Sequence, residues 1–563
     1  MSNDATRALH ELFREDWEHR MRAHPEWASY LGDKRYNDRW TDHSEEGFKA
    51  RHEHTLENLA RLEAIDRSAL SPEDQLNYDL FQDEQKTAAD EYSTNWRYIA
   101  LDARGGIQTL DNFSEQLSFG CAKDYDDWIA RLEALPTLMD QTISLLREGL
   151  RCGIKHSRVV MQRVPRQVES QIVDDAEQSR FYRPFVAMPG LSDAESGRLR
   201  QAARNAIVGC VVPSYRKLLA FVNEEYLPGC YEQAGAWQMP GGEEIYRHFV
   251  RKYTTTDMTP DEVFETGLQE VARIRAEMEK VKQESGFTGS MKEFFEFLRT
   301  DPRFFHETAE DLLTAYRAFA KRIDPLLVKV FRTIPRMPYG VDPIPEAVAP
   351  DTTAAYYQPP ADDGSRAGSY RVNLYQPESR PTHEIPALSM HEAVPGHHFQ
   401  IALAMELKDL PDFRRHGHWT AYIEGWALYA ESLGHELGLY DNPYAEFGRL
   451  TYEIWRAIRL VVDPGIHWKR WTRQQAIDYF LENSPKTELD VVNEIDRYIA
   501  WPGQAVAYKI GEIEIQKLRR NATDALGERF DLKEFHEVLL LAGPMPLSVL
   551  RKRVEAWVAS RRV

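Results

Sequence analysis

The residues best suited to metal chemistry lie in one short segment of the sequence, ALSMHEAVPGHHFQ. It contains His391 and Glu392, followed by His397 and His398. Zinc hydrolases need neutral imidazoles as ligands, a carboxylate that takes a proton from water, and one open coordination position. Three histidines and a glutamate beside a Pro-Gly pair are difficult to explain as surface residues. The segment therefore predicts a metal centre, and zinc is the metal that we expect.

The spacing of these histidines differs from the usual HExxH pattern, in which both ligands share one helical face. Here His397 follows His391 by six positions. Six residues of regular helix turn by about 600° and rise about 9 Å, so the two rings would diverge. Pro395 and Gly396 can interrupt a helix and loop out the two extra residues, which would return His397 to the face of His391. His398 remains the alternative second ligand.

A second segment, YIEGWALYAE, offers the third ligand. Glu424 lies 27 residues after His397, and the chain between them is polar and contains Pro and Gly. That length allows a second helix to return antiparallel to the first. We therefore expect His391, His397 and Glu424 to hold zinc, with Glu392 as the general base. Glu431 falls on roughly the same face as Glu424; it either orients a ligand histidine from behind or lies exposed.

These segments resemble known metallopeptidases. EGWALYAE looks like the NEGF-type second motif of zinc aminopeptidases, in which the Glu before Gly is the third zinc ligand. The lengthened first motif is similar in kind to that of the dipeptidyl peptidase III family. The sequence also resembles a bacterial family of unknown function, DUF885, grouped with the zincin peptidases. Its four shared segments are His391–Gln400, Glu424–Glu431, Asp463–Trp468 and Arg497–Gly511. The third departs from the pattern, because Trp468 directly follows His467. The resemblance implies zincin-like architecture and leaves the substrate open.

The last two segments suggest groups that could stabilise a developing oxyanion. By analogy with helical oligopeptidases, Tyr508 is the first choice, and His467 and Tyr498 are the other candidates; each tyrosine could instead be a packing residue. We expect Asp-Pro-Gly to break the helix before His467. Arg459, with Arg456 a helical turn away, could hold a substrate carboxylate or could pair with structural acids.

Apolar periodicity predicts a mainly α fold. Asp127 to Gly153 repeats apolar residues every three or four positions. Helix starts are predicted by capping sequences at Ser71, Ser192 and Thr259.

We expect a large two-lobed body around a deep cleft. Residues 1–330 would form the helical scaffold and residues 331–563 the zincin-like catalytic region. Prolines concentrate between Pro335 and Pro386, where Tyr370–Tyr375 predicts a short edge strand. Such a strand could pair with an extended peptide, with Asn373 and Tyr375 contacting the substrate.

Composition excludes several classes of protein. Acidic residues outnumber Lys plus Arg by 89 to 70, for a net charge of −19, which argues against a nucleic-acid partner. The four cysteines are scattered, which argues against a disulfide framework or a thiolate zinc site. The N-terminal segment is polar, and no apolar run by sequence reaches the ~18 residues that span a bilayer. We expect a cytoplasmic protein without a membrane partner; the oligomeric state is not indicated.

The sequence thus predicts a zinc-dependent peptidase. One alternative is a zinc amidase or esterase that acts on a non-peptide small molecule. Another is a catalytically inactive helical binding protein, although retention of Glu392 argues against it. Substrate length and the choice between exo- and endopeptidase remain open.

Overall fold

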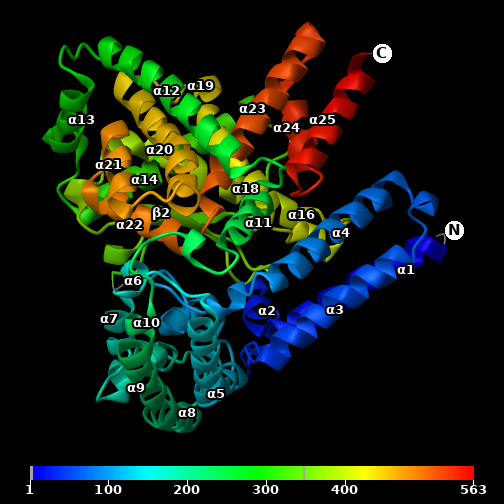
Figure 1. Cartoon of the computed structure of the whole chain (residues 1–563), viewed down its shortest axis with the longest axis vertical. Coiled ribbons are helices and arrows are strands. Elements are labelled where there is room, and N and C mark those ends of the chain that lie inside the picture. Colours follow the sequence, from blue (N-terminus) through cyan, green and yellow to red (C-terminus); the bar gives the residue numbers. More distant parts are fainter. Residues whose placement is uncertain (1–3, 347–348, 563) are drawn as a thin grey trace. The chain divides into compact units, whose positions relative to one another are not determined.

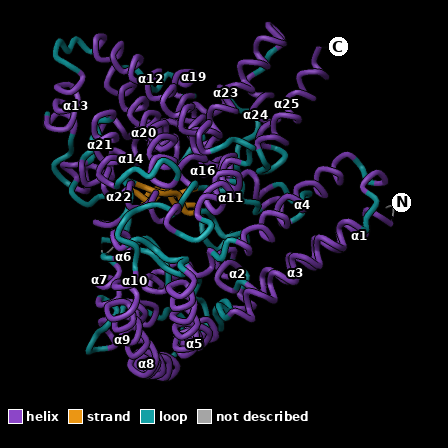
Figure 2. Tube along the Cα trace, in the orientation of Figure 1, coloured by secondary structure: helices purple, strands orange, loops and turns teal. Residues whose placement is uncertain are grey.

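The computed structural model describes residues 4–346 and 349–562 of the chain. These residues are mainly helical, with a small three-stranded sheet, as Figures 1 and 2 show. The prediction of a mainly α fold is confirmed.

The chain divides into two compact units. Unit 1 comprises Met1–Gln233, Gln238–Pro240 and Ala361–Arg366, and unit 2 comprises the remainder. The division therefore falls well before the predicted boundary at residue 330. The physical reason for the earlier division is that α12 (Pro260–Glu284) packs along α20 (Pro443–His467). The two helices are so close that a Cβ at Gly267 would lie 2.7 Å from the side chain of Leu460. The helices after residue 241 thus share a core with the predicted catalytic region.

Unit 1 is helical. Its helices are α1 (Asp4–Ala23), α2 (Pro25–Leu31), α3 (Glu45–Glu63), α4 (Pro72–Ser93), α5 (Ala122–Cys152), α6 (Arg158–Met161), α7 (Val164–Glu169), α8 (Asp193–Ala206), α9 (Val212–Phe221) and α10 (Leu227–Gly229). The predicted helix starting near Asp127 lies within α5, which ends at Cys152 and is followed by Gly153 in the left-handed conformation. Ser71 and Ser192 cap α4 and α8 as predicted, each side chain accepting a backbone N–H three residues on.

One stretch of the described chain, Asp193–Gly229, runs as a continuous helix through two π-helical segments, Ile207–Val211 and Val222–Tyr226. By length and composition alone it could cross a membrane, with a mean hydropathy of 1.2 in its most apolar window. Half of that window (50 %) is buried within the protein, as in many core helices. The stretch is therefore weak evidence for a membrane span.

Unit 2 carries the remaining helices. They are α11 (Gly242–Thr254), α12 (Pro260–Glu284), α13 (Met291–Thr300), α14 (Ala309–Ile323), α15 (Ile385–Glu392), α16 (His397–Glu406), α17 (Asp412–Arg415), α18 (Thr420–Ser432), α19 (Gly434–Leu437), α20 (Pro443–His467), α21 (Arg473–Asn483), α22 (Glu488–Ala500), α23 (Ala507–Leu526), α24 (Leu532–Leu540) and α25 (Leu547–Arg562). Thr259 caps α12 with the predicted capping box.

The sheet of unit 2 corrects one prediction. β3 (Gly368–Val372) lies between β1 (Tyr339–Pro343), to which it is parallel, and β2 (Ala355–Gln358), to which it is antiparallel. The strand predicted at Tyr370–Tyr375 is therefore central rather than an edge strand, and it ends at Val372. Both neighbours come from the proline-rich chain before it, where the sequence gives little strand signal. Their pairing satisfies both edges of β3.

The core of unit 2 centres on α20, which is buried along most of its length. α18 and α23 pack closely where two glycines meet: a Cβ at Gly511 would lie 1.9 Å from the carbonyl oxygen of Ala421 and 2.8 Å from the Cα of Gly425. α20 also continues through Pro464 to His467, contrary to the predicted break. A proline in the last turns removes one helical hydrogen bond, and the burial of α20 outweighs that loss.

Candidate metal centre

The predicted insertion after His391 takes the form of a break between two helices. α15 ends at Glu392 and α16 begins at His397, so the chain leaves the helix instead of bulging within it. Gly396 makes this turn possible, because a Cβ there would lie 1.9 Å from the carbonyl oxygen of His391. The indole of Trp426 donates to the carbonyl of Pro395 at 2.8 Å and holds the turn against α18.

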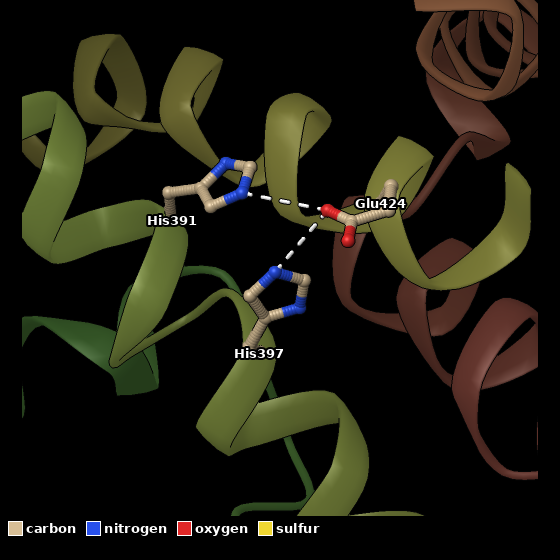
Figure 3. A group of neighbouring side chains, drawn as sticks. All are labelled: His391, His397 and Glu424. Atoms are coloured by element: carbon tan, nitrogen blue, oxygen red, sulfur yellow. Dashed lines mark ion pairs between the residues drawn. The ribbon is translucent and has the colours of Figure 1, made fainter. Parts of the chain in front are cut away.

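The break brings His391, His397 and Glu424 together, as Figure 3 shows. Oε2 of Glu424 lies 3.6 Å from Nε2 of His391 and 3.3 Å from Nε2 of His397. Ligand atoms around a tetrahedral zinc with bonds of about 2.1 Å are separated by about 3.4 Å. The same Oε2 is buried and has no hydrogen-bond partner among the described residues. The donor types, their separation and this unpartnered oxygen fit a zinc ion.

The electrostatics of the three residues favour a cation between them. Burial alone would raise the pKa of Glu424, but the two imidazoles hold it well below its usual range. Burial and Arg456 lower the pKa of His391, whereas the neighbouring carboxylates of Glu424, Glu431 and Glu392 raise it to about 9. Carboxylates thus surround His391, and a bound cation would balance them.

Glu431 contacts His391 from the side opposite Glu424. Nδ1 of His391 donates to Oε1 of Glu431 at 2.8 Å, and both side chains are buried. Arg456 lies behind this carboxylate, with Nη2 3.7 Å from Oε1. Because Nδ1 carries the proton of this hydrogen bond, Nε2 of a neutral ring is left as the ligand atom. Of the two roles considered for Glu431, the structure favours the orienting one.

Glu392 occupies the last position of α15 and is only 8 % exposed. Its carboxylate forms no hydrogen bond or ion pair with the part of the chain that the structure describes. A buried carboxylate without a protein partner next to His391 is available to accept a proton from water.

The side chain of His398 contacts Tyr357 and Met337 and not Glu424, so it is not the alternative ligand. Its Nδ1 lies 2.8 Å from the hydroxyl of Tyr357, and its Nε2 lies 2.9 Å from the carbonyl oxygen of Met337. Both ring nitrogens are therefore engaged, and burial lowers the pKa of the ring to about 4. Of the two histidines considered for the second ligand, His397 is the one beside Glu424.

Two predicted catalytic residues are instead structural. His467 is fully buried; its Nδ1 accepts from the backbone N–H of Ala236 at 3.0 Å, and its Nε2 donates to the carbonyl of Tyr498 at 2.9 Å. The hydroxyl of Tyr498 accepts from Trp455 at 3.0 Å and donates to Glu494 at 2.8 Å. With their polar atoms satisfied inside the core, neither residue can reach a substrate.

Of the two roles considered for Arg459, the structure shows pairing with a structural acid. It is 3 % exposed, donates to the hydroxyl of Tyr498 at 2.8 Å, and pairs with Glu494 at 3.1 Å. Its guanidinium also stacks on the ring of Tyr508, 4.3 Å from the centroid. Arg459 therefore supports Tyr508 from within the core and pairs with a structural acid. Tyr508 itself lies three residues before Gly511, where α23 packs against α18.

The two residues predicted to contact substrate from the strand have different surroundings. Asn373 is 1 % exposed, and its amide donates to three backbone carbonyls, of Ala349, Thr352 and Thr353. It fixes the turn after β3 and is not a substrate contact. Tyr375 lies beyond the strand and is 39 % exposed.

Sequence reasoning missed the part played by Trp426. Its indole anchors the turn between the two histidines, and its position two residues after Glu424 ties that turn to the same helix that carries the third ligand. Trp426 is part of the EGWA segment, but a tryptophan beside a glycine is more typical of a packed core than of a functional site.

Comparison with known protein families agrees with the resemblance to DUF885 that the four sequence segments indicated. Residues 25–554 match DUF885, described as a bacterial protein of unknown function. The chain belongs to the DUF885 family. A solved structure described as "the putative lipoprotein from Colwellia psychrerythraea" is 29 % identical, with a TM-score of 0.93 and 99 % of each chain covered.

A second solved structure with a similar fold is described as "a putative lipoprotein of unknown function from Shewanella oneidensis". It is 20 % identical, with a TM-score of 0.71, and covers 98 % of this chain and 99 % of its own, so it shows the fold alone. No curated protein was found to match the sequence. None of these relatives carries a stated activity.

Proposed function

We propose that this DUF885 protein is a zinc-dependent peptidase with zincin-like architecture. The observation that carries the proposal is the unpartnered Oε2 of Glu424, which lies 3.3 Å and 3.6 Å from the Nε2 atoms of His397 and His391. Glu392, a buried carboxylate with no partner among the described residues, directly follows His391. Two imidazoles, one carboxylate and a separate base form the set that metal-assisted hydrolysis needs.

A zinc ion held by these three residues would polarise a carbonyl oxygen and make a water molecule acidic enough to be deprotonated near neutral pH. Glu392 takes a proton from that water as its oxygen attacks the peptide carbonyl carbon. When the C–N bond breaks, Glu392 gives the proton to the leaving amine nitrogen. Glu431 holds the ring of His391 in place throughout.

Tyr508 is the proposed donor to the carbonyl oxygen as negative charge develops on it. Its ring is held by Arg459, and its hydroxyl lies 3.4 Å from Nε2 of Gln504. A peptide substrate that adds to the sheet would pair with an outer strand, β1 or β2, because β3 already has two neighbours.

The expected cytoplasmic location finds no support in the two related structures, each of which is described as a "putative lipoprotein". We infer that a location outside the cytoplasm, with lipid anchoring in some family members, is the better working hypothesis. Fractionation of cells that express the full-length gene, with detection of the protein in each fraction, tests this inference.

The decisive experiment for the activity combines metal analysis with a peptide library. Purified protein is loaded with zinc and incubated with mixed peptides, and the products are identified by mass spectrometry. We expect cleavage by the parental protein and none by Glu392→Gln, which should retain its zinc. If the zinc-loaded protein cleaves no peptide but hydrolyses small amides or esters, the peptidase assignment is wrong and the amidase or esterase alternative replaces it.

A further inference from the structure

A cavity in unit 2 lies next to the N-terminal end of α15. It holds about 150 Å³ and is bounded by the loop 378–384, by Tyr452 and Trp455 of α20, and by the chain before α22. A cavity of about this volume accommodates a benzene ring. Aromatic side chains form much of its wall: Phe305, Tyr316, Tyr452 and Trp455. Its size and lining suit a flat or compact apolar group.

Arg380 is the buried arginine in this wall, and its contacts with protein partners are long. It is 8 % exposed, yet its nearest carboxylate is that of Asp490, with Nη1 3.6 Å from Oδ1. Its Nε is 3.4 Å from the carbonyl oxygen of Tyr375. A well-paired guanidinium in the same unit, Arg473, approaches its aspartate to 2.6 Å. A buried guanidinium held only by long contacts retains the capacity to bind a carboxylate in two parallel hydrogen bonds.

The other cation that is buried in the wall is already neutralised. Nζ of Lys486 forms a close ion pair with Glu384 at 2.5 Å and lies over the rings of Tyr452 and Trp455, at 4.5 and 4.7 Å from their centroids. Lys486 therefore shapes the cavity without needing a ligand. This leaves Arg380 as the deeply buried cation with spare capacity for an anion.

His383 adds a buried polar atom to the same wall. Its side chain is 6 % exposed, and its Nδ1 has no hydrogen-bond partner among the described residues. Burial and the charge of Lys486 lower the pKa of His383 to about 3, so the ring is neutral near pH 7. The ring of His383 thus adds a polar but uncharged group to the wall.

We propose that this cavity binds a small organic carboxylate whose body is an aromatic ring or a compact aliphatic group. The apolar body packs against Tyr316, Tyr452 and Trp455, and the carboxylate accepts hydrogen bonds from Arg380. The site does not depend on the proposed peptidase activity, although hydrolysis of a peptide does release a carboxylate of this chemistry.

The test compares phenylacetate with its uncharged analogue phenylacetamide by isothermal titration calorimetry on the full chain. We expect phenylacetate to bind with one site per chain and phenylacetamide to bind at least about tenfold more weakly, because the uncharged amide offers Arg380 one acceptor oxygen in place of two charged ones. This comparison requires no variant. Equal affinities for the two compounds, or no binding of phenylacetate, would overturn the proposal.

Two variants locate the bound carboxylate. Arg380→Gln should weaken phenylacetate binding about tenfold or more, whereas Arg336→Gln, at an arginine whose side chain is 92 % exposed, should leave it unchanged. Glu424→Ala should also leave it unchanged, since the metal centre is separate. Loss of binding in Glu424→Ala with full binding in Arg380→Gln would place the carboxylate on the metal and refute the cavity site, while leaving the proposed function intact.

Discussion

The carboxylate of Glu431 accepts a hydrogen bond from Nδ1 of His391 at 2.8 Å, which leaves Nε2 of that ring facing Glu424. We expect Glu431→Gln to weaken zinc binding by about 10–100-fold, because the amide cannot hold the ring with a charge-assisted hydrogen bond. Competition with a chelator measures the affinity. Glu307→Gln, at an exposed glutamate, is the matched control. Equal zinc affinity in the two variants would contradict an orienting role for Glu431.

Zinc binding should require Glu424. The parental protein should contain about one equivalent of zinc, and Glu424→Ala should lose most of it, because two histidines alone leave the site one protein ligand short. Elemental analysis after dialysis gives the content. Full occupancy in a folded Glu424→Ala protein would mean that the third ligand lies elsewhere.

Glu392 should affect turnover and leave the metal content unchanged. Its amide counterpart is nearly the same size but cannot take a proton from water, so Glu392→Gln should lower the hydrolysis rate by about 10²–10⁴. Zinc content and rate are measured on the same sample, with a substrate identified from the peptide library. A variant that hydrolyses at the parental rate would remove Glu392 as the base.

The close contact of α18 and α23 should be sensitive to a single methyl group. Gly511→Ala would place a Cβ 1.9 Å from the carbonyl oxygen of Ala421, and overpacking of this kind costs about 1–3 kcal/mol. Gly197→Ala, in α8 with no atom near its Cβ, should instead stabilise by up to about 1 kcal/mol. Chemical denaturation measures both. A Gly511→Ala protein as stable as the parent would show that the helices can separate without cost.

Asp463 should make stability fall with rising pH. Burial raises its pKa to about 7, although hydrogen bonds from Tyr246 and Gly503 partly oppose the shift. Between the ordinary value of 3.8 and about 7, the folded protein keeps a proton that the unfolded chain has lost. The stabilisation is therefore present at low pH and lost as pH rises toward 7. Asp463→Asn lacks this titration, so its free energy of unfolding relative to the parent should increase between about pH 5 and about pH 8. A constant difference across that range would contradict the raised pKa.

The sequence predicted the helical fold and the three residues that meet in the candidate centre, because those depend on local signals. Capping boxes such as that of Thr259 and the Pro395-Gly396 pair act within a few residues of chain. The residues placed incorrectly depend on distant partners. His467 is satisfied by Ala236, and Tyr498 by Trp455 and Glu494. Likewise, β3 is a central strand because β1 and β2 pair with it, and both lie in proline-rich sequence that did not predict strands. Burial and pairing of this kind cannot be read from one stretch of sequence.

The break between α15 and α16 changes what a metal ion would connect. In an HExxH site both histidines share one helix, so a metal links two pieces of secondary structure. Here His391, His397 and Glu424 lie on three separate helices, α15, α16 and α18. A bound ion would therefore cross-link three helices. Unfolding of α16 alone would remove one of the three ligands, His397. Resistance of α16 to hydrogen exchange should then rise with zinc concentration, since binding stabilises only the state in which all three helices are in place.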